Sequence, residues 1–419
     1  MNFPLESFNF TLSNGLQCCF IPRKGILDNY ASLAVKFGSY HTYLPNQKTI
    51  PLGTAHFLEH LIFSAEALKN YQPLGTFANA TTNYDKTTYS IQFSTNIQRN
   101  IYLLFDIVFQ LKLTSEQIEN ERKIIQHELR NISDKTEWIS LYYLLETMYF
   151  NNPIRNPIGG NMDSLYDINL SILQDCFQYY YQPSNMFLFV TGDFQIEELK
   201  KYVEDYNWLH HFNNYFHYEI PFYSEPTISR KKIFEQTSLI SSSPYYLRGW
   251  KFNFTYLQGQ QLMEESLKIS ILLEAIFGKT SRLYEKLNAE ALISNDFEWQ
   301  FESFPGLGTA IVGGYTTDTH LIDRYIVDYI EMMKKSGFDP EDLERIKRHF
   351  IGMYVRCMDE AHQLATIFND WQARGANLVN IFYTLINLDL YEIDSLLKQL
   401  FICENSSVVV LSPKSEGSK

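Results

Sequence analysis

The residues best suited to chemistry in this sequence lie in the stretch AHFLEHLIF, residues 55–63. His56, Glu59 and His60 are spaced three and four positions apart, so on a helix their side chains share one face. Two imidazoles one turn apart can bind the same zinc ion, which in catalytic sites takes histidine nitrogens and carboxylate oxygens. Glu59 could then accept a proton from metal-bound water and deliver it to a leaving amine. The His-x-x-Glu-His order is typical of one class of zinc peptidases.

A catalytic zinc site usually has a third protein ligand, and the stretch ENERKIIQHEL (119–129) offers two candidates. Glu121 and Glu128 are seven positions apart, or about two helical turns, and so lie on the same side of a helix. Taken alone, such a pair is more typical of a solvated face. Equally, the two histidines and Glu59 could be ordinary buried polar residues, although burying them without partners would be costly.

An internal duplication favours the metal site over these alternatives. Helices are predicted at 114–129 and 339–353, each opened by a capping residue and acidic residues in its first turn. Aligning these helices places Glu121 opposite Ile346 and Glu128 opposite Met353. Carboxylates at positions where the second copy is apolar need a cation or hydrogen-bond donors. The second copy also has no His-x-x-Glu-His motif, so one half is predicted to bind the metal and the other to be a metal-free copy.

The elements that must position these residues repeat in the same order. A helix, a polar break and a strand are predicted at 167–193 and again at 387–413, and strand-like openings at 29–40 and 305–315. We predict an α+β fold of two homologous domains, each a mostly antiparallel sheet with helices packed on one side. Residues 1–220 would form the metal-bearing catalytic domain and 221–419 the metal-free domain. The connection between them is placed near 212–245, which is rich in Pro, Ser, Asn and Tyr.

Composition narrows the class of protein. With 419 residues and a net charge of −13, the chain is long enough for two domains and too acidic for a nucleic-acid partner. Its five cysteines form no Cys-x-x-Cys pair, which favours a reducing compartment. No signal peptide and no apolar run long enough to span a membrane is evident. These features predict a cytoplasmic protein.

The sequence resembles the pitrilysin/insulinase family of zinc metallopeptidases, and within it the half-size bacterial branch that includes mitochondrial processing peptidases. Five segments are similar to the family's motifs: TLSNGLQCCFIPR (11–23), GTAHFLEHLIF (53–63), NATTNYDKTTY (79–89), ERKIIQHEL (121–129) and PSNMFLFVTGD (183–193). This resemblance implies one Zn²⁺ per chain. It assigns the following roles: His56, His60 and Glu128 as ligands, Glu59 as general base, Glu121 as a carboxylate behind the ligands, and Asn79 as a substrate-binding residue beside an edge strand.

Two features depart from the family pattern. The stretch after the metal motif is shortened, which bears on the shape of the pocket. In SRLYEKLNAEALIS (281–294), many active relatives have an Arg and a Tyr that bind the substrate carbonyl, and our alignment places Asn288 and Ser294 there. Because stabilisation of the oxyanion is often a large catalytic contribution, the chain would need another source of it, such as a partner subunit.

Three functions follow as hypotheses. The first is a zinc-dependent endopeptidase that cleaves peptides or precursor leader segments. The resemblance implies that it would pair with a homologous motif-less subunit as a heterodimer, or form a homodimer. The second is a non-catalytic peptide-binding or scaffold subunit, which the absence of the Arg and Tyr favours. The third, a structural zinc module, is disfavoured because structural zinc usually has four protein ligands and no adjacent base.

Overall fold

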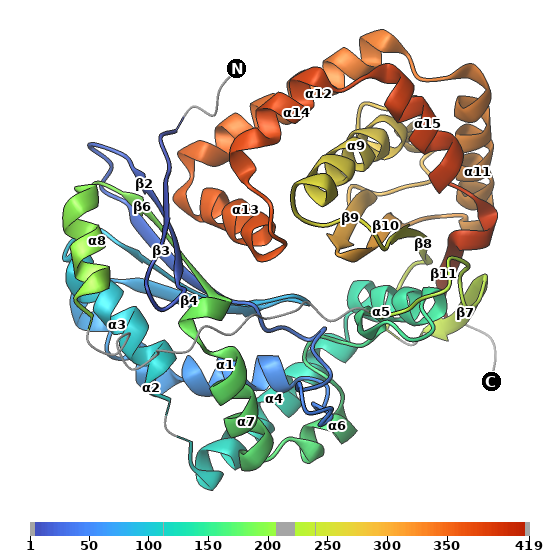
Figure 1. Cartoon of the computed structure of the whole chain (residues 1–419). Helices are drawn as coiled ribbons and strands as arrows, with labels where there is room; N and C mark the ends of the chain where they lie inside the picture. Colours follow the sequence, from blue (N-terminus) through green and yellow to red (C-terminus); the bar gives the residue numbers. More distant parts are fainter. Residues whose placement is uncertain (1–4, 112, 207–222, 239, 415–419) are drawn as a thin grey trace. The chain divides into compact units, whose positions relative to one another are not determined.

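The computed structural model describes residues 5–111, 113–206, 223–238 and 240–414, and within them the chain forms two compact units (Figure 1). Unit 1 comprises Met1–Leu129, Pro157–Pro221 and Val355–Leu378; unit 2 comprises Arg130–Asn156, Phe222–Tyr354 and Val379–Lys419. Each unit therefore takes a segment from the half of the chain that otherwise builds the other unit. The predicted division between residues 220 and 221 did not include this exchange. Part of the predicted connection near 212–245 lies outside the described residues.

The sheet of unit 1 has six strands in the order β1-β2-β6-β3-β5-β4. Only β2 and β6 pair in parallel; the other neighbours are antiparallel. The strands are β1 (Phe8–Thr11), β2 (Gln17–Pro22), β3 (Asn29–Val35), β4 (Phe77–Thr82), β5 (Thr87–Phe93) and β6 (Met186–Gly192). Strand β4 forms one edge of this sheet.

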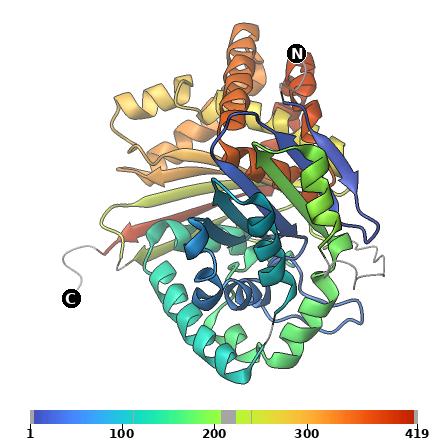
Figure 2. The same ribbon diagram turned by 90° about the vertical axis from the view of Figure 1, so that its left-hand side faces the viewer.

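The sheet of unit 2 has the order β7-β11-β8-β10-β9, and Figure 2 shows its strands side by side, with the red β11 among the yellow-green strands. Apart from the extra strand β1, its topology matches the first sheet strand for strand, down to the single parallel pair of β7 with β11. Its strands are β7 (Ile233–Ser238), β8 (Tyr245–Phe254), β9 (Glu298–Phe304), β10 (Gly306–Tyr315) and β11 (Ser406–Pro413). The prediction of an α+β fold with two mostly antiparallel sheets is confirmed.

One detail of the predicted repeat is different. The two segments expected to open the halves, 29–40 and 305–315, do contain strands, β3 and β10. These strands are not counterparts in the two sheets, because β10 has the position of β5 and β8 has that of β3. The reason is that β-branched and glycine-rich runs indicate that a strand exists without indicating its place in the sheet.

The helices predicted from sequence are present as α4 and α12, α7 and α15. In unit 1 the shortened stretch after the metal motif forms only α2 and one 3₁₀ turn, Gln72–Leu74. The helices are α1 (Thr54–Ile62), α2 (Ala65–Leu68), α3 (Ile97–Phe109), α4 (Ser115–Ser133), α5 (Thr136–Met148), α6 (Met162–Asp167), α7 (Leu170–Tyr180), α8 (Ile196–Glu204), α9 (Gly259–Phe277), α10 (Arg282–Ala289), α11 (Thr319–Ser336), α12 (Pro340–Asp359), α13 (Ala361–Ala373), α14 (Ile381–Asn387) and α15 (Leu390–Leu400).

Helices cover both faces of the first sheet, whereas the sequence predicted them on one side. Helix α3 packs against β3 and β5, and α13, from the second half of the chain, packs against β3 and β6 (Figure 1). Ser32 of β3 accepts a hydrogen bond from Asn369 of α13 at 2.8 Å, while its neighbour Leu33 points into the opposite, apolar core. All seven residues of β3 are buried, as expected for a strand covered on both faces.

The second sheet shows the same arrangement with a helix from the first half of the chain. Leu144 and Met148 of α5 lie so close to Gly249 of β8 that a Cβ there would be 2.5 Å from the Met148 sulfur. The next residue, Trp250, faces the other way and lies 5.8 Å, ring to ring, from Phe277 of α9. The two exchanged helices, α5 and α13, therefore complete the layer structure of the two units.

We expect Glu225→Gln to lower the free energy of unfolding by about 3–5 kcal/mol, because it leaves a buried lysine without its counter-charge. The Glu225 carboxylate accepts hydrogen bonds from Lys251 Nζ at 3.1 Å and from the backbone N–H groups of Phe150, Asn151 and Asn152. The Glu225 and Lys251 side chains are 8% and 2% exposed. Denaturant unfolding measures the change, and Glu235→Gln, an exposed carboxylate on β7, is the matched control. Equal stability of the two variants would contradict the expectation.

A buried cluster of charged residues in unit 1, formed by Asp85, Lys86 and Arg374, makes the free energy of unfolding depend on pH. Burial alone would raise the pKa of Asp85, but Lys86 and Arg374 outweigh it and lower the pKa to about 2. Since an aspartate in the unfolded chain has a pKa of about 3.9, the contribution is present above that pH and lost as pH falls toward 2. Wild type should therefore be about 2–3 kcal/mol more stable than Asp85→Asn at pH 7, and the difference should shrink between about pH 4 and pH 2. Urea unfolding across this range tests the expectation, which a pH-independent difference contradicts.

Candidate metal centre

Helix α1 presents the three motif residues on its polar face. Phe57, Leu58 and Ile62 are buried in the core of unit 1, while His56, Glu59 and His60 are half-buried on the other side. The helix begins after Gly53, whose φ of +85° is in the left-handed region. A Cβ at Gly53 would lie 2.4 Å from the carbonyl oxygen of Gly159, so only glycine allows the loop 157–160 to pack against the start of the helix.

The predicted ligands come together at the end of this face. His56, His60 and Glu128 each offer one ligand atom, and these atoms lie within 4.8 Å of one another. Glu128 Oε2 is 3.8 Å from His56 Nε2 and 3.5 Å from His60 Nε2. Two ligands at about 2.0–2.2 Å from one tetrahedral zinc ion lie roughly 3.3–3.6 Å apart. The donor set therefore fits a zinc ion with a position left for water or substrate, and the two distances from Glu128 lie within or slightly above the expected spacing.

The charges around the site also fit a cation. Burial, with His60 acting in the same direction, lowers the pKa of His56 to about 4, so its imidazole is neutral as a ligand must be. Burial alone would lower the pKa of His60, but hydrogen bonds to Glu121 and Glu128 outweigh it and raise the pKa to about 9. The hydrogen bond with His60 lowers the pKa of Glu128. The two carboxylates thus favour a positive charge at the position between the imidazoles.

Glu121 lies behind His60. Its Oε1 is 2.8 Å from His60 Nδ1, so a proton on Nδ1 leaves Nε2 free toward the metal position. His56 differs: its Nδ1 is buried against Gly159 and has no hydrogen-bond partner among the described residues. In the second copy, Ile346 of α12 is buried and Met353 is half-buried, so the residues that the sequence aligns with Glu121 and Glu128 are both apolar and shielded from solvent in part or in full.

Glu59 has a partner that the sequence analysis missed. Its Oε2 accepts a hydrogen bond from Thr82 Oγ1 at 2.6 Å, and burial raises the pKa of Glu59. Thr82 is the last residue of edge strand β4, and the alternation of that strand puts its side chain on the same face as Ala78 and Ala80, which pack against the core. This alternation could have indicated the contact from sequence, because the partly buried face of β4 packs against helix α1.

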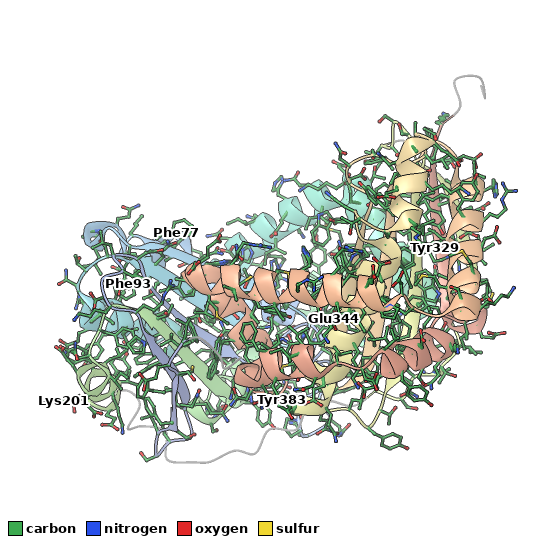
Figure 3. All side chains as sticks on the ribbon, turned by 90° about the horizontal axis from the view of Figure 1, so that it is seen from above. Phe77, Phe93, Lys201, Tyr329, Glu344 and Tyr383 are labelled. Carbon is green, nitrogen blue, oxygen red and sulfur yellow. The ribbon has the colours of Figure 1, made fainter. Side chains whose placement is uncertain are left out.

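Asn79 lies on the same strand but on the opposite face. Phe77, Asn79 and Thr81 are exposed and alternate with the half-buried residues of β4, and Phe77, labelled in Figure 3, is 68% exposed. Strand β4 pairs only with β5 among the described strands, so its second edge has free backbone groups. The position suits an extended peptide that adds to this edge; a direct role of the Asn79 side chain stays a prediction.

The residues that replace the expected Arg and Tyr lie in unit 2. Asn288 is exposed near the end of α10, and Ser294 is exposed in the loop that follows, where its hydroxyl bonds to Asp296. Arg282 is exposed at the start of the same helix, and Tyr284 is half-buried with its ring 6.2 Å from that of Phe297. Neither nearby side chain takes the sequence position of the missing pair.

Two family models match the chain and together account for most of it. Residues 30–161 match the model described as Insulinase (Peptidase family M16). This range includes His56, Glu59, His60 and Glu128. Residues 167–350 match the model described as Peptidase M16 inactive domain. All four of these residues lie in the first of the two matches.

Known relatives extend over nearly the whole chain. The zinc protease YmfH of Bacillus subtilis, itself uncharacterised, is 27% identical over 423 residues, covering 96% of each chain. The zinc protease PqqE of Helicobacter pylori is 24% identical over 432 residues, covering 96% of this chain and 92% of its own. The crystal structure of an M16-like peptidase from Alicyclobacillus acidocaldarius, 26% identical, superposes with a TM-score of 0.92 and covers 99% of this chain and all of the other.

Two further observations bear on the setting of the site. Among the described residues, no helix is both long and apolar enough to cross a membrane. All five cysteines lie in the described part of the chain, and each of them is a free thiol.

Proposed function

Because the chain belongs to the insulinase (M16) family of zinc peptidases, we propose that it is an endopeptidase that cleaves peptides or the leader segments of precursors. The observation that supports this most directly is the assembly of His56, His60 and Glu128 beside a half-buried Glu59. A zinc ion held by these three ligands would supply a Lewis acid that polarises water and the scissile carbonyl. A purely structural site would have no need of the adjacent carboxylate.

Residues other than the three ligands transfer protons, bind the peptide and orient a ligand. Glu59 takes the proton of the attacking water and passes it to the leaving amine, and burial raises its pKa, which makes the carboxylate a stronger base. The free edge of β4 holds the peptide in an extended conformation by backbone pairing, with Asn79 beside it. Glu121 keeps His60 oriented through Nδ1.

We propose further that the chain works as a dimer, with a homologous motif-less subunit or with a second copy, and in the cytoplasm. The free thiols suit a reducing compartment. Asn288 and Ser294 favour a partner that supplies the missing carbonyl-binding groups. The same two residues support the second candidate, a non-catalytic peptide-binding subunit. Such a subunit would keep the three zinc ligands but would not cleave the bound peptide.

The test is a purified chain with its zinc content measured, assayed on a library of unstructured peptides with and without a candidate partner. We expect about one zinc per chain and cleavage that a chelator abolishes and added zinc restores. Absence of zinc from the purified and zinc-treated protein contradicts the metal assignment. Bound zinc with peptide binding but no cleavage under any condition supports the non-catalytic candidate.

A further inference from the structure

A hydrogen bond joins the end of edge strand β4 to the predicted general base on helix α1, from Thr82 to Glu59. The Thr82 hydroxyl lies 2.6 Å from Glu59 Oε2, and it is the hydrogen-bond partner of that carboxylate among the described side chains. Both residues are half-buried. A carboxylate on a flexible side chain loses rotational freedom when one of its oxygens is bound, so this contact decides how Glu59 is oriented.

The hydroxyl hydrogen bonds of Thr82 and Thr87 show which oxygen of the Glu59 carboxylate accepts a hydrogen bond. Thr87, the cross-strand neighbour of Thr82, donates its hydroxyl proton to the carbonyl oxygen of Phe37 at 2.8 Å. Its oxygen can therefore only accept from Thr82, at 3.3 Å. The single proton of Thr82 goes to the much closer Glu59 Oε2. Oxygen Oε2 of Glu59 is thus occupied by a donor, and Oε1 is the oxygen left to accept a proton from water.

The backbone of Thr82 is held unusually firmly for the end of an edge strand. The turn that follows is closed by a hydrogen bond from Asn83 N to Lys86 O at 2.8 Å. A Cβ at Gly38 would lie 2.4 Å from the Asn83 carbonyl oxygen, so a second backbone segment presses on this turn.

Helix α13 fixes the same turn through charges. Lys86, whose side chain is 3% exposed, pairs with Asp370 at 2.5 Å, and Arg374 Nε lies 3.0 Å from Asp85. Asp370 is on α13, and Arg374 is the C-cap residue directly after it. A segment from the second half of the chain therefore anchors the turn that sets the position of the Thr82 hydroxyl.

We propose that Thr82 is the positioning residue of the general base: it donates to Oε2 of Glu59 and thereby directs Oε1 to the attacking water. This inference rests on the proposed peptidase function. It concerns the orientation of Glu59 and not the binding of zinc, since Thr82 contacts no ligand in the described structure. A role limited to packing would be preserved in an isosteric valine, which makes the two roles separable.

The experiment compares Thr82→Val, which removes the hydroxyl and keeps the shape, with Thr82→Ser, which restores a hydroxyl. Thr11→Val is the matched control, because Thr11 ends the edge strand β1 at the opposite edge of the same sheet and is exposed. We expect Thr82→Val to lower kcat about 10- to 100-fold with KM within about twofold, at unchanged zinc content and Tm. Thr82→Ser should recover kcat to within a few-fold of wild type, and Thr11→Val should equal wild type.

Two kinetic results overturn the proposal: Thr82→Val with kcat within twofold of wild type, or Thr82→Val and Thr82→Ser impaired equally. Crystal structures of the zinc-loaded variants provide a readout that does not need activity. We expect the Glu59 side chain to change rotamer or lose order in Thr82→Val and to stay in place in Thr82→Ser. If wild type cleaves no peptide, the proposed function fails, and an unmoved Glu59 in Thr82→Val separately refutes the positioning role.

Discussion

Replacing Glu59 by glutamine is expected to lower kcat for peptide cleavage by about 10²- to 10⁴-fold while the zinc content stays near one ion per chain. Glutamine keeps the size of the side chain and can still accept the hydrogen bond from Thr82, which in the wild type is 2.6 Å from Oε2. What it loses is the ability to take a proton. KM should change little, because Glu59 acts on water and on the leaving group and not on the bulk of the peptide.

The measurement is steady-state kinetics on a reporter peptide together with metal analysis of the same sample. Glu197→Gln is the matched control, since Glu197 is an exposed carboxylate in the first turn of α8, away from the motif in sequence. Cleavage by Glu59→Gln at the wild-type rate, with zinc bound, would remove Glu59 from the mechanism and leave the search for another base. Loss of zinc in this variant would assign Glu59 to the metal site instead.

Replacing Glu128 by alanine is expected to lower the bound zinc from about one ion per chain to near zero at micromolar protein. Two imidazoles alone leave the ion short of its usual three protein ligands and remove the only negative charge in the ligand set. Glu121→Gln should behave differently: zinc remains bound, and its affinity falls about 10- to 100-fold, because the hydrogen bond to His60 Nδ1 is weakened while the ligands stay.

Zinc affinity is measured by competition with a chromophoric chelator, and Glu116→Gln, an exposed carboxylate in the first turn of α4, is the control on the same helix. Thermal unfolding of each variant without added zinc separates loss of the ligand from loss of the fold. Full zinc occupancy in Glu128→Ala would contradict the ligand assignment. Equal effects of the two substitutions would contradict the distinction between ligand and supporting residue.

Sequence alone determined the local parts of this protein. The spacing of His56, Glu59 and His60 required a common helix face because the period of an α-helix is a property of the backbone. The comparison of Glu121 and Glu128 with Ile346 and Met353 rests on a similar expectation, that a duplicated helix keeps its buried face. The α+β class could also be predicted from sequence, because strands and helices have different hydrophobic periodicities. The repeat could be predicted because the same order of elements recurs in the two halves.

Tertiary structure decided what depends on contacts between residues distant in sequence. Which strand neighbours which, the exchange of α5 and α13, and coverage of both sheet faces follow from packing that no local pattern specifies. The same holds for Thr82, whose partner Glu59 lies 23 positions away, and for the anchoring of its turn by Asp370 of α13 and by Arg374 at the end of that helix. The zinc motif lies within about one turn of a helix and can be recognised from sequence. The proposed orientation of Glu59 depends instead on the edge strand β4 and on α13, a helix from the other half of the chain.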